Sequence, residues 1–230
     1  MLAASVALGL DLSYPDYATF LKEFVCKGGV AYEQIRANQP ELEKAKADFS
    51  SMKHDELMAA SKSTQIAFYV NLYNLYTIDL IVRHLPLKKG IKDINGPWAI
   101  KFIPLFGDTV SLDHIEHEIL RKEFKEPRIH FTLVCASKSC PVLSEKPYRG
   151  DSLNTQLDLA ARRFLSDTTR NRFTANASDI SKIFDWYGDD FKPVFGSATA
   201  FISKIVAKPV SNRVHFNDYD WSLNRVDKCE

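Results

Sequence analysis

The chain has 230 residues, which is enough to bury a sizeable hydrophobic core without the support of disulfides or a metal. Hydrophobic residues make up 45% and charged residues 26%, a balance that excludes a wholly disordered protein. The net charge is +1 and both signs are mixed along the whole length, so no nucleic-acid partner is expected. Nothing in this composition indicates an oligomeric state.

The N-terminal segment 1–13 contains the apolar run LAASVALGL, which is similar to the end of a secretory signal but lacks a basic region before it. We interpret it as an extension or as the remnant of a signal, followed by a single domain over residues 14–230. The most apolar stretch, residues 65–85, is interrupted by two asparagines, an aspartate and an arginine, so no integral membrane segment is expected. We expect a soluble protein, either cytoplasmic or exported with a trimmed signal.

Helical spacing of apolar residues predicts the elements of the first third of the chain. A first helix over residues 13–25 ends before the Gly28-Gly29 pair, because glycine favours helix termination. Residues 41–60 are polar with scattered apolar positions, which predicts two short helices that separate near residue 50.

The longest predicted helix spans residues 63–85 and is apolar on all sides, so we expect it to be buried. Asn71 and Asn74 lie three residues apart and therefore share one face of this helix. A buried amide without partners costs about 1–3 kcal/mol, so both must be hydrogen-bonded. We favour a role in fastening neighbouring loops, with contact between an asparagine, Asn74, and the substrate as the alternative.

The rest of the chain mixes strands and helices. A Gly107-Asp108 hairpin precedes a helix over residues 115–124 that Ser111 or Asp113 caps. The further predicted elements are an apolar strand within 128–143, a helix from 151 or 152 to 165, a strand at 172–175, helices at 179–187 and 197–206, and a last strand at 213–221. This pattern predicts the α+β class, as a helix-rich single domain with a small, mainly antiparallel sheet. We interpret the aromatic residues of its C-terminal part, Trp186, Tyr187, Tyr219 and Trp221, as core packing, with a groove for a peptide or a sugar as the alternative.

The most informative segment is RIHFTLVCASKSCPVL, in which the predicted strand ends in Cys135 and Cys140. A thiol at the end of a rigid strand is held where a substrate can reach it. Upstream, Glu116 and His117 place a carboxylate and a base on a predicted helix. A cysteine nucleophile needs a histidine to take its proton and a third polar group to orient the imidazole. Cysteine chemistry is therefore the leading hypothesis, although neighbouring helix residues point about 100° apart and direct contact between Glu116 and His117 is not assured.

His130 is the alternative base. In an extended strand, residues five apart face opposite sides and lie about 17 Å apart, so His130 and Cys135 are not expected to pair directly. Arg121 lies one turn after His117 and would either bind a substrate carboxylate or pair structurally with Glu118 or an acid elsewhere, which is the role we favour. The small residues around Ser137 would let backbone groups approach an oxyanion. The predicted substrate-binding residues are Asn74, Arg121, His130, Ser137 and Cys140.

Three other roles for the cysteines remain open. Cys135 and Cys140 can close a small disulfide loop in an oxidising compartment, join a histidine in a zinc site, or stay as inert buried thiols. The spacing is weak as a metal signature, and we expect neither a metal ion nor a cofactor. With Cys26 and Cys229, the cysteines are too few and too scattered to indicate a disulfide scaffold, and the latter two are given no chemical role.

Six ordered blocks of sequence closely resemble the domain-of-unknown-function 547 family. They are FYVNLYNLYTI from Phe68, SLDHIEHEILR from Ser111, IHFTLVCASKSCPVL from Ile129, LDLAARRFL from Leu157, ISKIFDWYGDDF from Ile180 and YDWSLN from Tyr219. The resemblance implies similarity to papain-like or transglutaminase-like cysteine hydrolases with a permuted chain order. It also favours Cys135 as the nucleophile, because the second cysteine can be serine in plant-type relatives, and it puts His117 forward as the base.

The resulting hypothesis is a cysteine-dependent hydrolase or acyltransferase that acts on an amide or peptide-like bond, in a peptide-like or small amide substrate. Cys135 is the nucleophile, His117 the base and Glu116 the carboxylate that orients the base or contacts the substrate. The alternative is a non-catalytic protein-interaction domain in which the same residues form a structural polar core.

Overall fold

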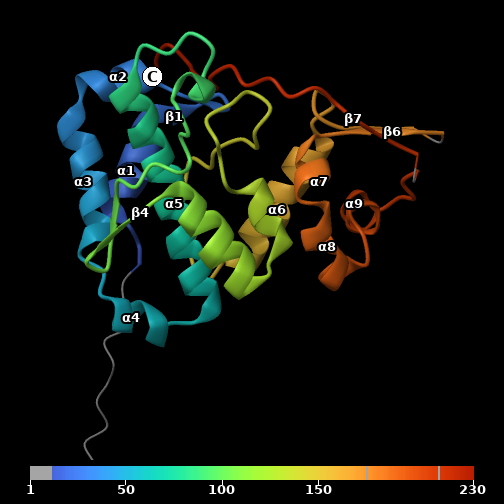
Figure 1. Ribbon diagram of the computed structural model, residues 1–230, viewed down its shortest axis with the longest axis horizontal. Coiled ribbons are helices and arrows are strands. Elements are labelled where there is room, and N and C mark those ends of the chain that lie inside the picture. Colours follow the sequence, from blue (N-terminus) through green and yellow to red (C-terminus); the bar gives the residue numbers. More distant parts are fainter. Residues whose placement is uncertain (1–11, 175, 212) are drawn as a thin grey trace, which may run out of the picture.

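The computed structural model describes residues 12–174, 176–211 and 213–230 (Figure 1). All but the last two residues of the predicted N-terminal extension 1–13 lie outside this part of the chain. The elements of the first half are α1 (Pro15–Phe24), β1 (Val25–Cys26), β2 (Gly29–Val30), α2 (Tyr32–Ala37), α3 (Gln39–Ser50), α4 (His54–Ala59), α5 (Lys62–His84), η1 (Ile91–Asp93), β3 (Ile103–Leu105) and β4 (Asp108–Val110). The elements of the second half are η2 (His114–Phe124), η3 (Pro127–Phe131), α6 (Leu153–Ser166), β5 (Arg172–Phe173), β6 (Ser178–Ile180), α7 (Ile183–Trp186), α8 (Gly188–Phe195), α9 (Ala198–Val206) and β7 (Val214–Phe216).

The long helix α5 is the centre of the first half of the fold (Figure 1). It begins after Ser61, whose hydroxyl accepts a hydrogen bond from the Thr64 amide at 3.1 Å and so caps the first turn. Buried side chains surround it on all sides, and α2, α3, α4, α6 and η2 pack against it. The predicted buried helix is thus confirmed, as are the break between α3 and α4 and the hairpin β3–β4.

The β-structure confirms the α+β class but differs from a single small sheet. It is divided among β1–β2, β3–β4 and a three-stranded sheet in the order β5-β6-β7. The predicted hairpin is present as β3–β4, and β5 and β6 also pair antiparallel, whereas β6 and β7 pair in parallel, with Ser178 opposite Val214 and Ile180 opposite Phe216. This pairing joins segments more than 30 residues apart, so local sequence patterns did not indicate it.

The helix predicted at 179–187 is only partly present. Its first residues form β6, and α7 begins at Ile183, whose amide donates to the Ser181 hydroxyl at 3.3 Å. The Ser181 amide is bound in turn by the Asn171 side chain at 3.1 Å, which ends the strand there. The next helix, α8, was not predicted because its first residue, Gly188, was interpreted as a break.

The strand predicted within 128–143 is absent, and this is the largest difference from the sequence prediction. Residues 127–131 form the 3-10 helix η3, which Pro127 starts and which the Glu126 carboxylate caps by accepting from the Arg128 amide at 3.1 Å. The following residues are irregular, because the Asn74 side chain binds the Thr132 carbonyl and the Val134 amide at 2.9 Å each. These are backbone groups that a neighbouring strand would otherwise take.

Buried apolar residues form two clusters. The larger one surrounds α5, and the smaller one lies among α6, α7, α8 and α9. Two elements contribute to both: α6 gives Leu157 to the first and Phe164 to the second, and η3 gives Ile129 to the first and Phe131 to the second. The site described below lies where these two clusters meet.

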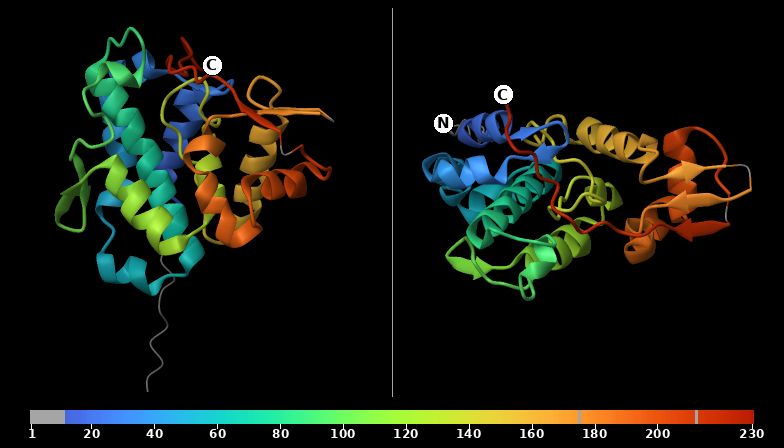
Figure 2. Two further views of the ribbon diagram at one scale, coloured as in Figure 1. Left: turned by 45° about the vertical axis from the view of Figure 1, so that its right-hand side comes forward. Right: turned by 90° about the horizontal axis from the view of Figure 1, so that it is seen from above.

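The C-terminal segment after β7 runs back across the molecule to the N-terminal elements (Figure 2). Arg225 pairs with Val30 of β2, and a disulfide joins Cys26 to Cys229 over a sequence separation of 203 residues. All four cysteines are paired, since Cys135 bonds to Cys140. The sequence did not point to the first bond, because its two cysteines are almost a chain length apart. Among the described helices, none has the length and apolar character that a membrane crossing requires.

Candidate functional site

A cavity of about 360 Å³ opens between η2, η3, α7 and the C-terminal segment. This volume is within the range of small-molecule sites. Its polar and sulfur-containing lining comes from η1, η2, η3 and the loop after Val134: Lys92, Asp113, Glu116, His117, His130, Cys135 and Cys140. The fold therefore brings the predicted nucleophile, both candidate histidines and the predicted carboxylate to one cavity.

Cys135 lines this cavity and is partly buried. Its Sγ is bonded to Cys140, and it lies 3.1 Å from Ser137 Oγ and 3.4 Å from the Tyr219 hydroxyl. Burial raises the pKa of Tyr219 to about 12, so its hydroxyl stays protonated at neutral pH. Within the described part of the chain, no histidine nitrogen hydrogen-bonds to this sulfur. The closest polar neighbours of Cys135 are therefore hydroxyl groups.

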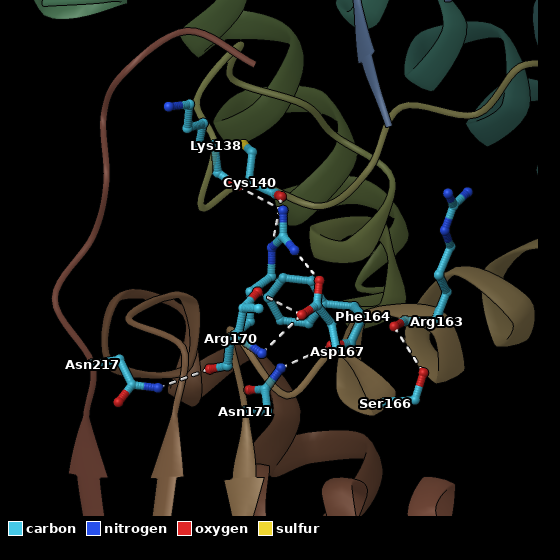
Figure 3. Close-up of polar contacts among 10 residues, drawn as sticks. Lys138, Cys140, Arg163, Phe164, Ser166, Asp167, Arg170, Asn171 and Asn217 are labelled. Carbon is cyan, nitrogen blue, oxygen red and sulfur yellow. Dashed lines mark hydrogen bonds and ion pairs between the residues drawn. The ribbon is translucent and has the colours of Figure 1, made fainter. Parts of the chain in front are cut away.

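The loop that carries the two cysteines is held from both sides. Figure 3 shows the Arg170 guanidinium reaching the carbonyls of Lys138 and Cys140, at 2.6 and 3.2 Å, while it also pairs with Asp167. On the other side, the Lys138 amide donates to the Ser222 carbonyl at 2.8 Å. Ala136 has a φ of +62°, a left-handed conformation that a small residue tolerates better than a bulky one. These contacts fix the backbone around Cys135.

Asn74 holds the backbone that leads into this loop and does not line the cavity. Its amide is 2% exposed, and both of its ends are bound by the backbone of Thr132 and Val134. Asn71 makes the same two-ended contact with the Tyr148 backbone, at 2.8 and 2.9 Å. These contacts fit the favoured interpretation, in which the asparagines fasten neighbouring loops, and Asn74, the alternative substrate contact, is not among the residues that line the cavity.

We expect Asn74→Ala to destabilise the protein by about 2–4 kcal/mol, because it leaves a buried carbonyl and a buried amide without partners. Asn71→Ala is the matched control, since it removes the same two contacts at a distance from the cysteine loop. Urea unfolding should give similar losses for both variants, whereas only Asn74→Ala should change the alkylation rate of reduced Cys135. Equal alkylation rates in the two variants would contradict the positioning role.

Glu116 and His117 both line the cavity but have different partners. The buried Glu116 carboxylate accepts hydrogen bonds from the Tyr73 and Tyr187 hydroxyls; burial first, and then this negative charge, raises the pKa of both phenols. His117 Nδ1 lies 3.0 Å from an Arg121 nitrogen, and its Nε2 lies 3.6 Å from Asp113. Because a guanidinium can only donate, Nδ1 of His117 is the acceptor in this contact. Arg121 thus binds the ring of the predicted base.

These residues lie on η2, which forms with π-helical hydrogen bonds in place of the predicted α-helix. The apolar residues Ile115, Ile119 and Leu120 recur at spacings of four and five, which also fit this wider turn. Helical segments of this kind are rare and occur often at functional sites. Ser111 caps the start, as predicted, by accepting from the His114 amide at 3.2 Å.

His130 belongs to a charged network that sequence reasoning missed. Its Nε2 lies 2.7 Å from Asp190 Oδ2, and Arg121 binds the same carboxylate through two nitrogens at 2.7 and 2.9 Å. The ring is 2% exposed and stacks on Tyr187 with 4.0 Å between centroids. Burial alone would raise the pKa of Asp190, but the hydrogen bonds from His130 and Arg121 hold it well below its usual range.

The argument against a direct pairing of His130 with Cys135 rested on a wrong premise. It assumed an extended strand, whereas η3 turns the chain and brings His130 and Cys135 to the same cavity. Asp190 lies 60 residues after His130, so no local pattern could pair the two. Its presence in the YGDDF block is the one sequence signal that could have drawn attention to it.

Aromatic side chains form the outer wall of the cavity, where core packing was predicted. Trp186 is 42% exposed and stacks on Trp221 with 5.7 Å between centroids, and Tyr219 lies 4.6 Å from Trp221. The Lys92 ammonium lies 3.8 Å from the Trp221 centroid. A partly exposed aromatic surface of this kind suits an apolar or planar substrate group.

Comparison with known proteins finds a match to a family model but none to an individual protein. Residues 57–165 match the model of a family described as "Protein of unknown function, DUF547". No curated protein and no solved structure matches the chain. Four of the six motif blocks lie within the matched segment, and the blocks that begin at Ile180 and Tyr219 lie beyond it. This match agrees with the family resemblance that the motifs carry, and the matched segment contains Glu116, His117, His130 and Cys135.

Proposed function

We propose that the protein is a cysteine-dependent hydrolase or acyltransferase that acts on an amide or peptide-like bond, with reduced Cys135 as its nucleophile. The observation that carries the proposal is the shared cavity, which holds Cys135 together with two histidines and a buried carboxylate. The papain-like or transglutaminase-like character implied by the sequence motifs is part of this proposal. The Cys135–Cys140 disulfide is then an inactive form, because only a free thiolate attacks a carbonyl carbon.

The reaction follows the usual course of acyl transfer through sulfur. The Cys135 thiolate attacks the carbonyl carbon, and the imidazolium that has taken the thiol proton returns it to the leaving amine. Water or a second amine then takes the acyl group from the sulfur. The backbone amides of Lys138 and Ser139 already bind carbonyls of the C-terminal segment, so the hydroxyls of Ser137 and Tyr219 are the donors available beside the sulfur.

The contacts of the two histidines favour His130 over His117 as the base, while Glu116 keeps its proposed role in substrate contact. A base is oriented by an acceptor behind its ring, and Asp190 supplies this acceptor to His130. His117 instead accepts a hydrogen bond from Arg121 at Nδ1, so the nitrogen that would take a proton is already occupied. His117 remains the base that the motifs indicate, and the experiment below distinguishes the two.

The test is alkylation of the reduced protein with iodoacetamide at pH 6, followed by peptide mapping. An ordinary thiol is only about 0.3% thiolate at this pH. We expect Cys135 to react at least about tenfold faster than Cys140 and than the same cysteine in the urea-unfolded protein. His130→Gln should lower the rate of Cys135 to that of an ordinary thiol, and His117→Gln should leave it within about threefold.

Cys140→Ser serves as a control, because it keeps the loop but removes the disulfide partner. In this variant Cys135 should react without prior reduction at the rate of the reduced native protein. A Cys135 rate no higher than that of the unfolded chain would contradict the nucleophile and leave the non-catalytic interaction domain. A larger loss in His117→Gln than in His130→Gln would return the role of base to His117.

A further inference from the structure

A second concave surface is lined by a later part of the C-terminal segment, within residues 222–228. This basic groove has a volume of about 690 Å³ and receives side chains from the β1–β2 turn, the loop after α5, the cysteine loop and the C-terminal segment. Five of its lining residues are cations and one is an acid: Lys27, Lys88, Lys138, Arg225, Lys228 and Asp227. The whole chain has a net charge of only +1, so this concentration of positive charge is local.

The backbone holds these cations together. The disulfide between Cys26 and Cys229 holds the Cα atoms of these cysteines 5.8 Å apart. It therefore keeps their sequence neighbours, Lys27 and Lys228, in adjacent segments of the chain. Arg225 is fixed by its pairing with Val30. Figure 2 shows the end of the C-terminal segment lying against the β1–β2 region.

The remaining two cations are also fixed through their backbone. The Lys138 amide and carbonyl are bound by Ser222 and Arg170, and the Lys88 amide donates to Asp93 at 2.7 Å. Gly90, with a φ of +106°, lets this loop approach the Trp221 carbonyl so closely that a side chain would clash. The backbone on which the groove cations lie is therefore fixed by covalent and hydrogen bonds.

The charge of the groove is only partly offset by its one acidic lining residue, Asp227. None of its five cations forms an ion pair with a carboxylate in the described part of the chain, whereas several exposed lysines elsewhere pair along their helices, as Lys44 does with Glu41 and Lys192 with Asp189. Like charges held close together repel, and a bound anion would relieve this repulsion. A covalent bond that keeps two such charges adjacent suits a binding role better than a purely structural one.

We infer that the basic groove binds a small polyanion that carries two or more phosphate or carboxylate groups. The volume fits a small ligand, and lysine and arginine both form strong charge-assisted hydrogen bonds with such groups. The inference does not depend on the proposed cysteine chemistry, because none of the groove residues lines the cavity.

The test is calorimetric titration of the oxidised protein with tripolyphosphate and, separately, with tricarballylate, a small molecule with three carboxylates. We expect saturable binding of one molecule per chain, weakened by added salt because salt screens exposed charges. Tighter binding of the first probe identifies a phosphate ligand, and tighter binding of the second a carboxylate ligand.

The decisive variant is Lys27→Gln with Arg225→Gln and Lys228→Gln, which should weaken binding at least about tenfold. The matched control is Lys53→Gln with Lys101→Gln and Lys192→Gln, which changes the net charge equally on exposed residues outside the groove and should change the affinity less than about threefold. Thermal unfolding of both variants checks that they fold. Equal weakening in the two variants, or no saturable binding of either probe to the native protein, would overturn the inference.

Discussion

Phe131→Ala is expected to lower the free energy of unfolding by about 3–5 kcal/mol, the usual cost of emptying a well-packed aromatic position. Phe131 is 1% exposed and its ring stacks on Phe201 with 5.5 Å between centroids. It also lies 5.3 Å from Phe164 and 5.8 Å from Phe184. A single side chain from η3 thus supports the aromatic cluster that α6, α7 and α9 share.

Urea unfolding of the oxidised protein measures this loss. Leu159→Ala on α6 is the control, because Leu159 is 60% exposed and its truncation should change stability by no more than about 0.5 kcal/mol. A loss below about 2 kcal/mol for Phe131→Ala would mean that neighbouring rings refill the space.

Helices whose apolar residues recur at regular spacing were predictable, because the signal is local. The breaks between α3 and α4 and the burial of α5 follow from residues within each segment. Elements that depend on distant partners were not. Residues 128–134 have strand-like composition, yet Asn74 binds their backbone, and β6 pairs in parallel with β7, which returns to it from a distant part of the chain.

In the candidate site, too, residues within local motifs were predictable and pairings between distant residues were not. The motifs brought attention to Cys135, Glu116 and His117, and all three line one cavity. The pairing of His130 with Asp190 could not be inferred, because one local error, the assumed strand, placed His130 on the wrong side. The disulfide between Cys135 and Cys140 was one of several alternatives that composition and spacing left open.

Asp190→Asn is expected to destabilise the protein by about 2–4 kcal/mol at neutral pH, because removing one partner leaves buried charge without compensation. Asp190 is the common partner of His130 and Arg121, and its side chain is 24% exposed, so the cost should fall short of that of a fully buried pair. The substitution keeps the size of the side chain and removes only its charge. Asp189→Asn is a matched control on the preceding residue, since the Asp189 side chain is 87% exposed and its bond to Lys192 contributes little.

The effect should depend on pH with a defined sign. The pKa of Asp190 in the folded protein lies below that of the unfolded chain, which is about 3.9. Its ionised form therefore stabilises the fold fully above about pH 4, and this contribution is lost as the pH falls below that value. Urea unfolding at several pH values should show the difference between the native protein and Asp190→Asn shrinking below about pH 4.

The same variant tests whether Asp190 acts through His130. If Asp190 orients the base, Asp190→Asn should slow the alkylation of reduced Cys135 at pH 6, while Asp189→Asn should leave it unchanged. A purely structural Asp190 would lower stability and leave that rate intact under conditions in which the variant is folded. The two readouts together separate the stabilising role of this carboxylate from its proposed role in orienting the base.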